Sequence, residues 1–105
     1  MSYDLQGKVI LFTGAAGGIG SATARELYAH GTSLVLTDTS QEAVDKLAQE
    51  FNSQRVLPLA FDVTDAEAAK EVIQRAVEHF GRLDVAFANE GILWRGVPAR
   101  RSALT

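Results

Sequence analysis

A short apolar segment that runs directly into a glycine-rich loop constrains this chain more than any other feature. The apolar segment ends at Phe12, the loop reads Thr13-Gly14-Ala15-Ala16-Gly17-Gly18-Ile19-Gly20, and a helical pattern follows from Ser21. Strand, tight loop and helix in this order predict a phosphate site, because the first amides of a helix lack partners and carry partial positive charge. Glycines allow unusual backbone angles and a close approach to a pyrophosphate. The alternative is a loop that only connects a strand to a helix.

The composition is typical of one ordinary globular domain. With 105 residues, 47% hydrophobic and 22% charged, the chain can bury a modest core. The net charge of −3 does not indicate nucleic-acid binding. No cysteine is present, so disulfides, thiol nucleophiles and thiolate metal sites are excluded, and we predict no metal site. The apolar runs are too short for a membrane span or a signal peptide, so we expect a cytoplasmic location and no membrane partner.

Buried-type strands alternate with amphipathic helices along the chain. Such an alternation with short connections predicts an α/β fold with a parallel sheet. Pro58 cannot donate to a sheet ladder, so the third strand should lie at an edge. Patterns of a capping box, Thr39 with Glu42 and Thr64 with Glu67, are expected to start the second and third helices. The predicted strands are Lys8–Phe12, Ser33–Thr37, Val56–Phe61 and Leu83–Ala88.

An acidic residue, Asp38, ends the second strand, 24 residues after Gly14. In dinucleotide-binding folds an acid at this point accepts hydrogen bonds from the adenosine ribose and repels a 2′-phosphate. Because Thr39 follows rather than arginine, and no basic residue precedes Gly18, NAD is favoured over NADP. The alternative is that Asp38 only helps to start the next helix.

Four features in order along residues 5–92 resemble the short-chain dehydrogenase/reductase family. They are Thr13-Gly14-x-x-x-Gly18-Ile19-Gly20, Asp38, Asp62-Val63 and the turn Ala88-Asn89-Glu90-Gly91-Ile92. The resemblance implies a Rossmann-like doubly wound parallel sheet with strand order 3-2-1-4, and hydride transfer with a nicotinamide cofactor. Glu90 departs from the family pattern, which has alanine there, and a carboxylate beside an anionic cofactor is unfavourable unless it faces solvent or a base.

The resemblance also implies roles for individual residues. The glycine loop would hold the pyrophosphate of NAD and Asp38 its ribose. Asp62 and Val63 would line the adenine, whereas Asn89 and Gly91 would support the strand end beside the nicotinamide ribose. The complete set of predicted cofactor-binding residues is Gly14, Gly17, Gly18, Ile19, Gly20, Asp38, Asp62, Val63, Asn89 and Gly91.

The family's catalytic serine and Tyr-x-x-x-Lys pair have no counterpart in this sequence. Its only tyrosines are Tyr3 and Tyr28, and the residues four positions later are Gly7 and Thr32. We therefore predict no catalytic residue and expect the family's catalytic residues to lie beyond Thr105. Alone, the chain is expected to bind at most the adenosine end of NAD and to be inactive as an enzyme.

We expect two parts, an NAD-binding Rossmann half-domain at 1–91 and an irregular basic tail at 92–105. All 13 acidic residues precede the tail, whereas three arginines lie within it. A truncated sheet would leave the fourth strand as an exposed edge, so we expect a homo-oligomer formed through this strand or the helices beside it. The alternative function is a non-enzymatic, self-associating module that keeps the fold without a ligand.

Overall fold

The computed structural model of the chain describes residues 5–62, 64–88 and 91–95. Within them the chain alternates between strands and helices. In order, the elements are β1 (Val9–Phe12), α1 (Gly18–Ala29), β2 (Ser33–Leu36), α2 (Gln41–Ala48), β3 (Val56–Pro58), α3 (Ala66–Phe80), β4 (Val85–Ala88) and β5 (Gly91–Arg95).

The sheet has the order β3-β2-β1-β4-β5, and its first four strands are parallel. The predicted order 3-2-1-4 is therefore confirmed. β3 is the outermost of the parallel strands, as Pro58 required. The strand itself ends at Pro58 instead of Phe61, although the amides of Leu59 and Phe61 still donate to the carbonyls of Leu36 and Asp38 at 3.0 and 2.9 Å.

The sheet does not end at β4, because a fifth strand, β5, lies beside it. It pairs with β4 in an antiparallel arrangement, with a register shift between Ala86 and Phe87. The prediction that β4 forms an exposed edge is wrong, because β1 pairs with one of its sides and β5 with the other. Residues 92–95 are likewise in a strand and not irregular, whereas the rest of the expected tail lies outside the described residues.

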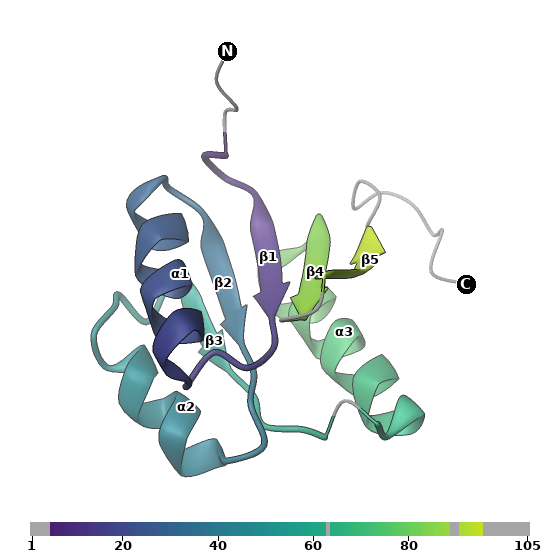
Figure 1. Ribbon diagram of the computed structural model, residues 1–105. Coiled ribbons are helices and arrows are strands. Elements are labelled where there is room, and N and C mark those ends of the chain that lie inside the picture. Colours follow the sequence, from purple (N-terminus) through teal and green to yellow (C-terminus); the bar gives the residue numbers. More distant parts are fainter. Residues whose placement is uncertain (1–4, 63, 89–90, 96–105) are drawn as a thin grey trace.

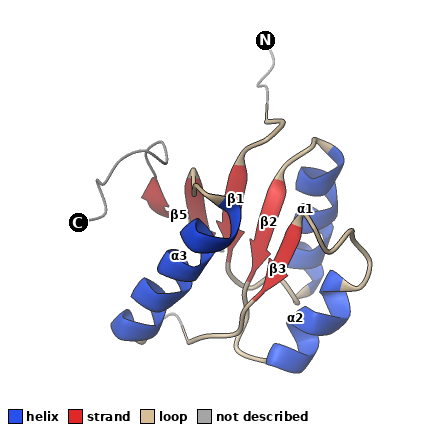
Figure 2. Cartoon of the chain, turned by 180° about the vertical axis from the view of Figure 1, so that it is seen from behind, coloured by secondary structure: helices blue, strands red, loops and turns tan. Residues whose placement is uncertain are grey.

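Helices cover both faces of the sheet. α1 and α2 lie on one face and α3 on the other (Figure 1; Figure 2 shows the α3 side). Along β1, Ile10 and Phe12 join the core beneath α1 and α2, while Val9 and Leu11 join the core beneath α3. This alternation explains why the strand sequence is apolar throughout. No helix in the described ranges is long and apolar enough to cross a membrane.

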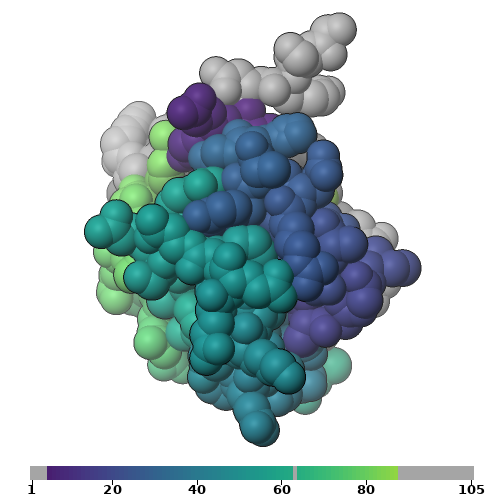
Figure 3. Space-filling model, turned by 90° about the vertical axis from the view of Figure 1, so that its left-hand side faces the viewer, coloured from purple at the N-terminus to yellow at the C-terminus, as the bar shows by residue number. Residues whose placement is uncertain are grey.

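The C-terminal end of α1 is anchored by Arg55, which precedes β3. Its guanidinium donates to the carbonyls of Tyr28 and Thr32 at 2.6 and 2.7 Å and lies 3.7 Å from the centre of the Tyr28 ring. A cation at this end of a helix satisfies carbonyls that lack partners within the helix. α1 and α2 with the segment that follows α2 form one continuous surface, which Figure 3 shows.

Both predicted capping boxes are wrong by one residue. Ser40, not Thr39, caps α2 by accepting a hydrogen bond from the Ala43 amide at 3.2 Å. Asp65 caps α3 by accepting bonds from the first-turn amides. At both places the residue after the expected threonine has the oxygen that accepts the first-turn amides, while the threonine hydroxyl itself bonds to an aspartate that precedes it.

Asp84 joins the beginning of β4 to the beginning of β1. Its carboxylate accepts bonds from the Val9 amide at 2.8 Å and from Arg82 at 2.8 and 3.0 Å, and its own amide donates to the Val9 carbonyl. Burial raises the pKa of Asp84, but the bonds from Arg82 and Val9 and the charges of Arg82 and Lys8 outweigh it, so the net shift is downward.

A lowered pKa in the folded state means that the Asp84 carboxylate stabilises the fold above its ordinary pKa of about 3.9. This stabilisation is lost as the pH falls through the lower pKa of the folded state. We therefore expect Asp84→Asn to reduce the free energy of unfolding by about 1–3 kcal/mol at pH 7. In urea titrations from pH 7 to pH 3, the difference from the original chain should shrink below about pH 4.

The matched control is Glu71→Gln, which changes an exposed carboxylate on α3. Its free energy of unfolding should equal that of the original chain at every pH. If the difference in free energy of unfolding between Asp84→Asn and the original chain stays constant down to pH 3, the assigned role of Asp84 is wrong.

Candidate functional site

The glycine loop between β1 and α1 is held on both sides by neighbouring strands. The amide of Thr13 donates to the Phe87 carbonyl at the end of β4, and the amide of Ala15 donates to the Thr37 carbonyl after β2, both at 3.0 Å. The loop thus lies at the carboxyl ends of the parallel strands, beside β1, where the strand order changes direction. This position is where open α/β sheets bind their ligands.

The glycines of the loop serve different purposes. Gly14 has a φ of 71°, which side chains other than glycine rarely allow. A Cβ on Gly20 would lie 2.0 Å from the Gly14 carbonyl oxygen, so glycine is required there for α1 to approach the loop. A Cβ on Gly18 would meet nothing within 4 Å. Space above Gly18 is therefore open to a ligand.

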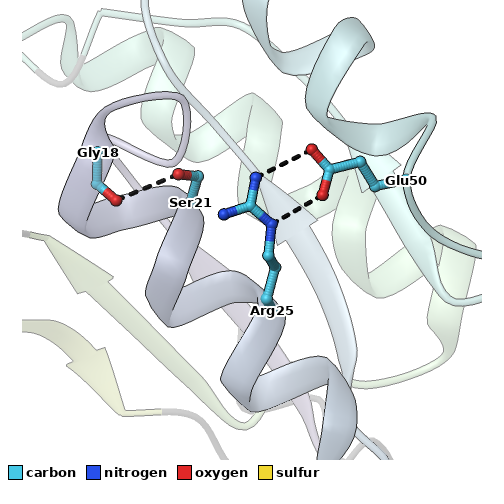
Figure 4. Close-up of polar contacts among 4 residues, drawn as sticks. All are labelled: Gly18, Ser21, Arg25 and Glu50. Atoms are coloured by element: carbon cyan, nitrogen blue, oxygen red, sulfur yellow. Dashed lines mark hydrogen bonds and ion pairs between the residues drawn. The ribbon is translucent and has the colours of Figure 1, made fainter.

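The first turn of α1 presents backbone N–H groups without protein acceptors. Among the described residues, none accepts a hydrogen bond from the amides of Gly18, Ile19 or Gly20, and the N-cap Gly17 supplies no side-chain cap. The Ser21 hydroxyl donates to the Gly18 carbonyl at 3.2 Å and leaves these amides free (Figure 4). The Ile19 side chain is 82% exposed. This end of α1 can accept an anion.

Arg25, one turn further along α1, does not contribute its charge to the loop. Its guanidinium forms two bonds with the Glu50 carboxylate, at 2.7 and 3.0 Å, on the side of α1 that faces the end of α2 (Figure 4). The hydrogen bond from Arg25 lowers the pKa of Glu50 and raises that of Arg25 itself. Because residues 13–20 include no basic side chain, the positive potential of the loop comes from its amides.

Asp38 lies beside the loop at the end of β2. One carboxylate oxygen accepts the Ala16 amide at 3.0 Å, and the other accepts the Thr39 amide at 2.7 Å. Asp38 therefore links the glycine loop to β2. The alternative that it starts α2 finds no support in these contacts, because Ser40 caps that helix.

Asp62 lies beyond the end of β3, at the same edge of the sheet. One of its oxygens accepts the hydroxyl and the amide of Thr64 at 2.7 and 2.9 Å, and these bonds lower the pKa of the Asp62 carboxyl. The other oxygen has no partner among the described residues and is exposed to solvent. Asp62 thus presents an acceptor at this edge. Val63 lies outside the described residues.

The remaining predicted residues follow β4. Gly91 begins β5 and pairs with Ala88, whereas Asn89, like Glu90, lies outside the described residues. The structure thus brings the glycine loop, Asp38 and Asp62 to one edge of the sheet. It does not describe the side toward a nicotinamide ribose.

Two residues near this edge were missed in the sequence. The buried Thr37 donates its hydroxyl to the Phe12 carbonyl at 3.0 Å, so it joins β1 to β2 just before the loop. Gln41, on the first turn of α2, bonds to Pro58 at the end of β3 and to Ala60 just after it. A polar residue at the end of an apolar strand was a usable signal for Thr37. The bonds from Gln41 to β3 and beyond had no such signal, because these partners lie 17 and 19 residues away.

Two further findings concern the described structure away from the glycine loop. In the described ranges no three His, Asp or Glu side chains gather to hold a metal ion. A cavity of about 230 Å³ between β3 and α3 is lined by Leu57, Arg75, Glu78 and His79, and it shares no residue with the glycine loop.

Comparison with known proteins agrees with this geometry. The family model for short chain dehydrogenases matches residues 8–103. A 3-oxoacyl-(acyl-carrier-protein) reductase of Thermotoga maritima is 41% identical over 90 residues, which cover 84% of this chain and 37% of the relative.

Solved structures show the same fold. A glucose/ribitol dehydrogenase from Brucella melitensis superposes with a TM-score of 0.77 and 33% identity, over 83% of this chain and 37% of that one. A short chain dehydrogenase/reductase from Burkholderia phymatum, in complex with NAD, gives a TM-score of 0.76 and 27% identity. The match covers 82% of this chain and 31% of that chain. This chain spans about a third of the length of these relatives. The family match over most of its residues shows that the chain belongs to the short chain dehydrogenase family.

Proposed function

We propose that this chain binds NAD as the cofactor-binding part of a short chain dehydrogenase. The pyrophosphate would lie against the amides of Gly18, Ile19 and Gly20, and the adenosine ribose would bond to Asp38. Asp62 and Val63 would contact the adenine. Gly14 and Gly17 would shape the loop, and Asn89 and Gly91 would support the side toward the nicotinamide ribose.

The observation that carries the proposal is the combination of free amides with open space at the start of α1. Three amides lack protein acceptors, and a Cβ on Gly18 would meet no atom within 4 Å. Every helix leaves its first amides without partners within the helix, but at this helix no side chain caps them and the space above Gly18 is open. A helix N-terminus of this kind attracts a phosphate through its N–H groups and its dipole.

The charge beside the loop supports NAD over NADP. The Asp38 carboxylate is in direct contact with the loop, since it accepts the Ala16 amide at 3.0 Å. A ribose hydroxyl can donate to this carboxylate, whereas a 2′-phosphate would place two negative charges side by side. The Burkholderia relative is described in complex with NAD, which is consistent with the same choice here.

Hydride transfer by the whole protein is part of the proposal. A bound nicotinamide supplies the hydride chemistry, and the residues described here bind and orient the cofactor. The sequence has no Tyr-x-x-x-Lys pair, so we assign proton transfer to none of its residues. The alternative of a self-associating module without ligand has less support, because both sides of β4 are paired and the first amides of α1 have no acceptor among the described residues.

Asp38→Asn removes the charge of Asp38 together with one of its two acceptor oxygens. The amide keeps one oxygen that can accept a loop or ribose bond, and it no longer repels a phosphate. In calorimetric titrations we expect the original chain to prefer NAD over NADP by at least about tenfold, and we expect Asp38→Asn to reduce this preference severalfold. An equal affinity of the original chain for both cofactors would contradict the assigned role.

Two glycine substitutions separate the fold from the site. Gly20→Ala places a methyl group against the Gly14 carbonyl and should lower the free energy of unfolding by about 1–3 kcal/mol. Gly18→Ala meets no protein atom and should leave stability within about 1 kcal/mol of the original, because alanine also favours a helix.

Gly18→Ala should nevertheless weaken NAD binding at least about tenfold, because its methyl group fills the space proposed for the pyrophosphate. Thermal unfolding and NAD titration of the same samples test both effects. If Gly18→Ala binds NAD as tightly as the original chain, the pyrophosphate does not lie at this point.

A further inference from the structure

β3 is an edge strand, and its outer side has backbone groups that no neighbouring strand can satisfy. The inner side continues to pair beyond Pro58, through the amides of Leu59 and Phe61. On the outer side, the side chain of Gln41 meets the backbone. Its Nε2 donates to the Pro58 carbonyl at 3.3 Å, and its Oε1 accepts the Ala60 amide at 3.0 Å.

The side-chain amide of Gln41 thus occupies the place of a peptide group in a missing neighbouring strand. A peptide group offers one donor and one acceptor, and a glutamine amide offers both. The orientation of the amide is set by Asp45, one turn along α2, whose Oδ1 accepts a second bond from Nε2 at 2.8 Å. Gln41 can therefore present its oxygen to Ala60 and its nitrogen to Pro58 without rotating.

These bonds hold the segment that leads to Asp62. On its inner side the Phe61 amide donates to the carbonyl of Asp38 at 2.9 Å, and on its outer side Ala60 is held by Gln41. Asp62 follows directly and is fixed on its far side by Thr64. The position of Asp62 therefore depends on the bonds that hold Ala60 and Phe61.

We propose that Gln41 is a positioning residue for the adenine end of the nucleotide. It fixes residues 58–60 against α2 and through them the place of Asp62, without contacting the ligand itself. This inference rests on the proposed binding of NAD, and it adds a specific role for α2 in that binding. It also predicts that the pyrophosphate end, held by α1, is independent of Gln41.

The test compares two probes on the full chain, ADP and inorganic pyrophosphate, titrated by NMR and calorimetry. Gln41→Ala should weaken ADP about fivefold to tenfold, which corresponds to the loss of one or two neutral hydrogen bonds. Pyrophosphate affinity should change by less than about twofold, because the loop amides are unaffected. Hydrogen exchange of the Ala60 amide should become faster.

Two further variants separate positioning from stability. Gln41→Glu keeps an acceptor for Ala60 but turns a carboxylate oxygen toward the Pro58 carbonyl and toward the Asp45 carboxylate, which in the original chain accepts a bond from Nε2 at 2.8 Å. It should therefore weaken ADP at least as much as Gln41→Ala, and its affinity for pyrophosphate should again change by less than about twofold. Gln74→Ala changes an exposed glutamine of α3. Its affinities for ADP and for pyrophosphate should equal those of the original chain.

Different failures have different meanings. If the original chain binds ADP and Gln41→Ala binds it equally well, the positioning role is wrong and the proposed function stands. If Gln41→Ala weakens ADP and pyrophosphate to the same extent, Gln41 acts on the whole fold and the positioning role is again wrong. If the original chain binds neither probe, the proposed function falls, and the role of Gln41 falls with it.

Discussion

The hydrogen bonds from the glycine loop to the two strands beside β1 determine where α1 begins. Thr13 donates to β4 and Ala15 to the residue after β2, so the loop can neither tilt toward one neighbour nor lift from the sheet. Close packing of Gly20 on Gly14 then sets the approach of α1. Because Arg55 holds the opposite end of the same helix, the free amides at its start have a fixed position. A phosphate site built from backbone requires this kind of rigidity.

The edge formed by the carboxyl ends of the strands is joined by side chains as well as by backbone. Asp38 links β2 to the loop, and Gln41 links α2 to the segment after β3. A ligand that spans the edge would therefore contact groups whose relative positions are already set. Such preorganisation reduces the entropy lost on binding. The same bonds satisfy backbone groups that edge strands and tight loops leave unpaired, so fold stability and the proposed site depend on shared contacts.

Much of the architecture was predictable because the relevant signals are local. Alternating apolar strands and amphipathic helices indicated the parallel sheet, and Pro58 placed β3 at an edge. The helix starts were displaced by one residue because two adjacent polar side chains could cap each helix, Thr39 or Ser40 and Thr64 or Asp65, and the sequence pattern does not distinguish them. β5 was missed because no apolar alternation marks residues 91–95, and the pairing with β4 is a tertiary contact.

By itself the sequence determined the fold family and the position of the phosphate loop, since glycine spacing and strand patterning follow from backbone sterics within a few residues. Only the tertiary structure distinguished glycines that look alike in the sequence. Gly20 is needed for packing and Gly18 leaves space for a ligand. The tertiary structure also decided that Asp38 bonds to the loop and that Gln41 reaches β3 and Ala60. These contacts join residues 17 to 22 positions apart, a separation at which no periodic pattern constrains the side chains.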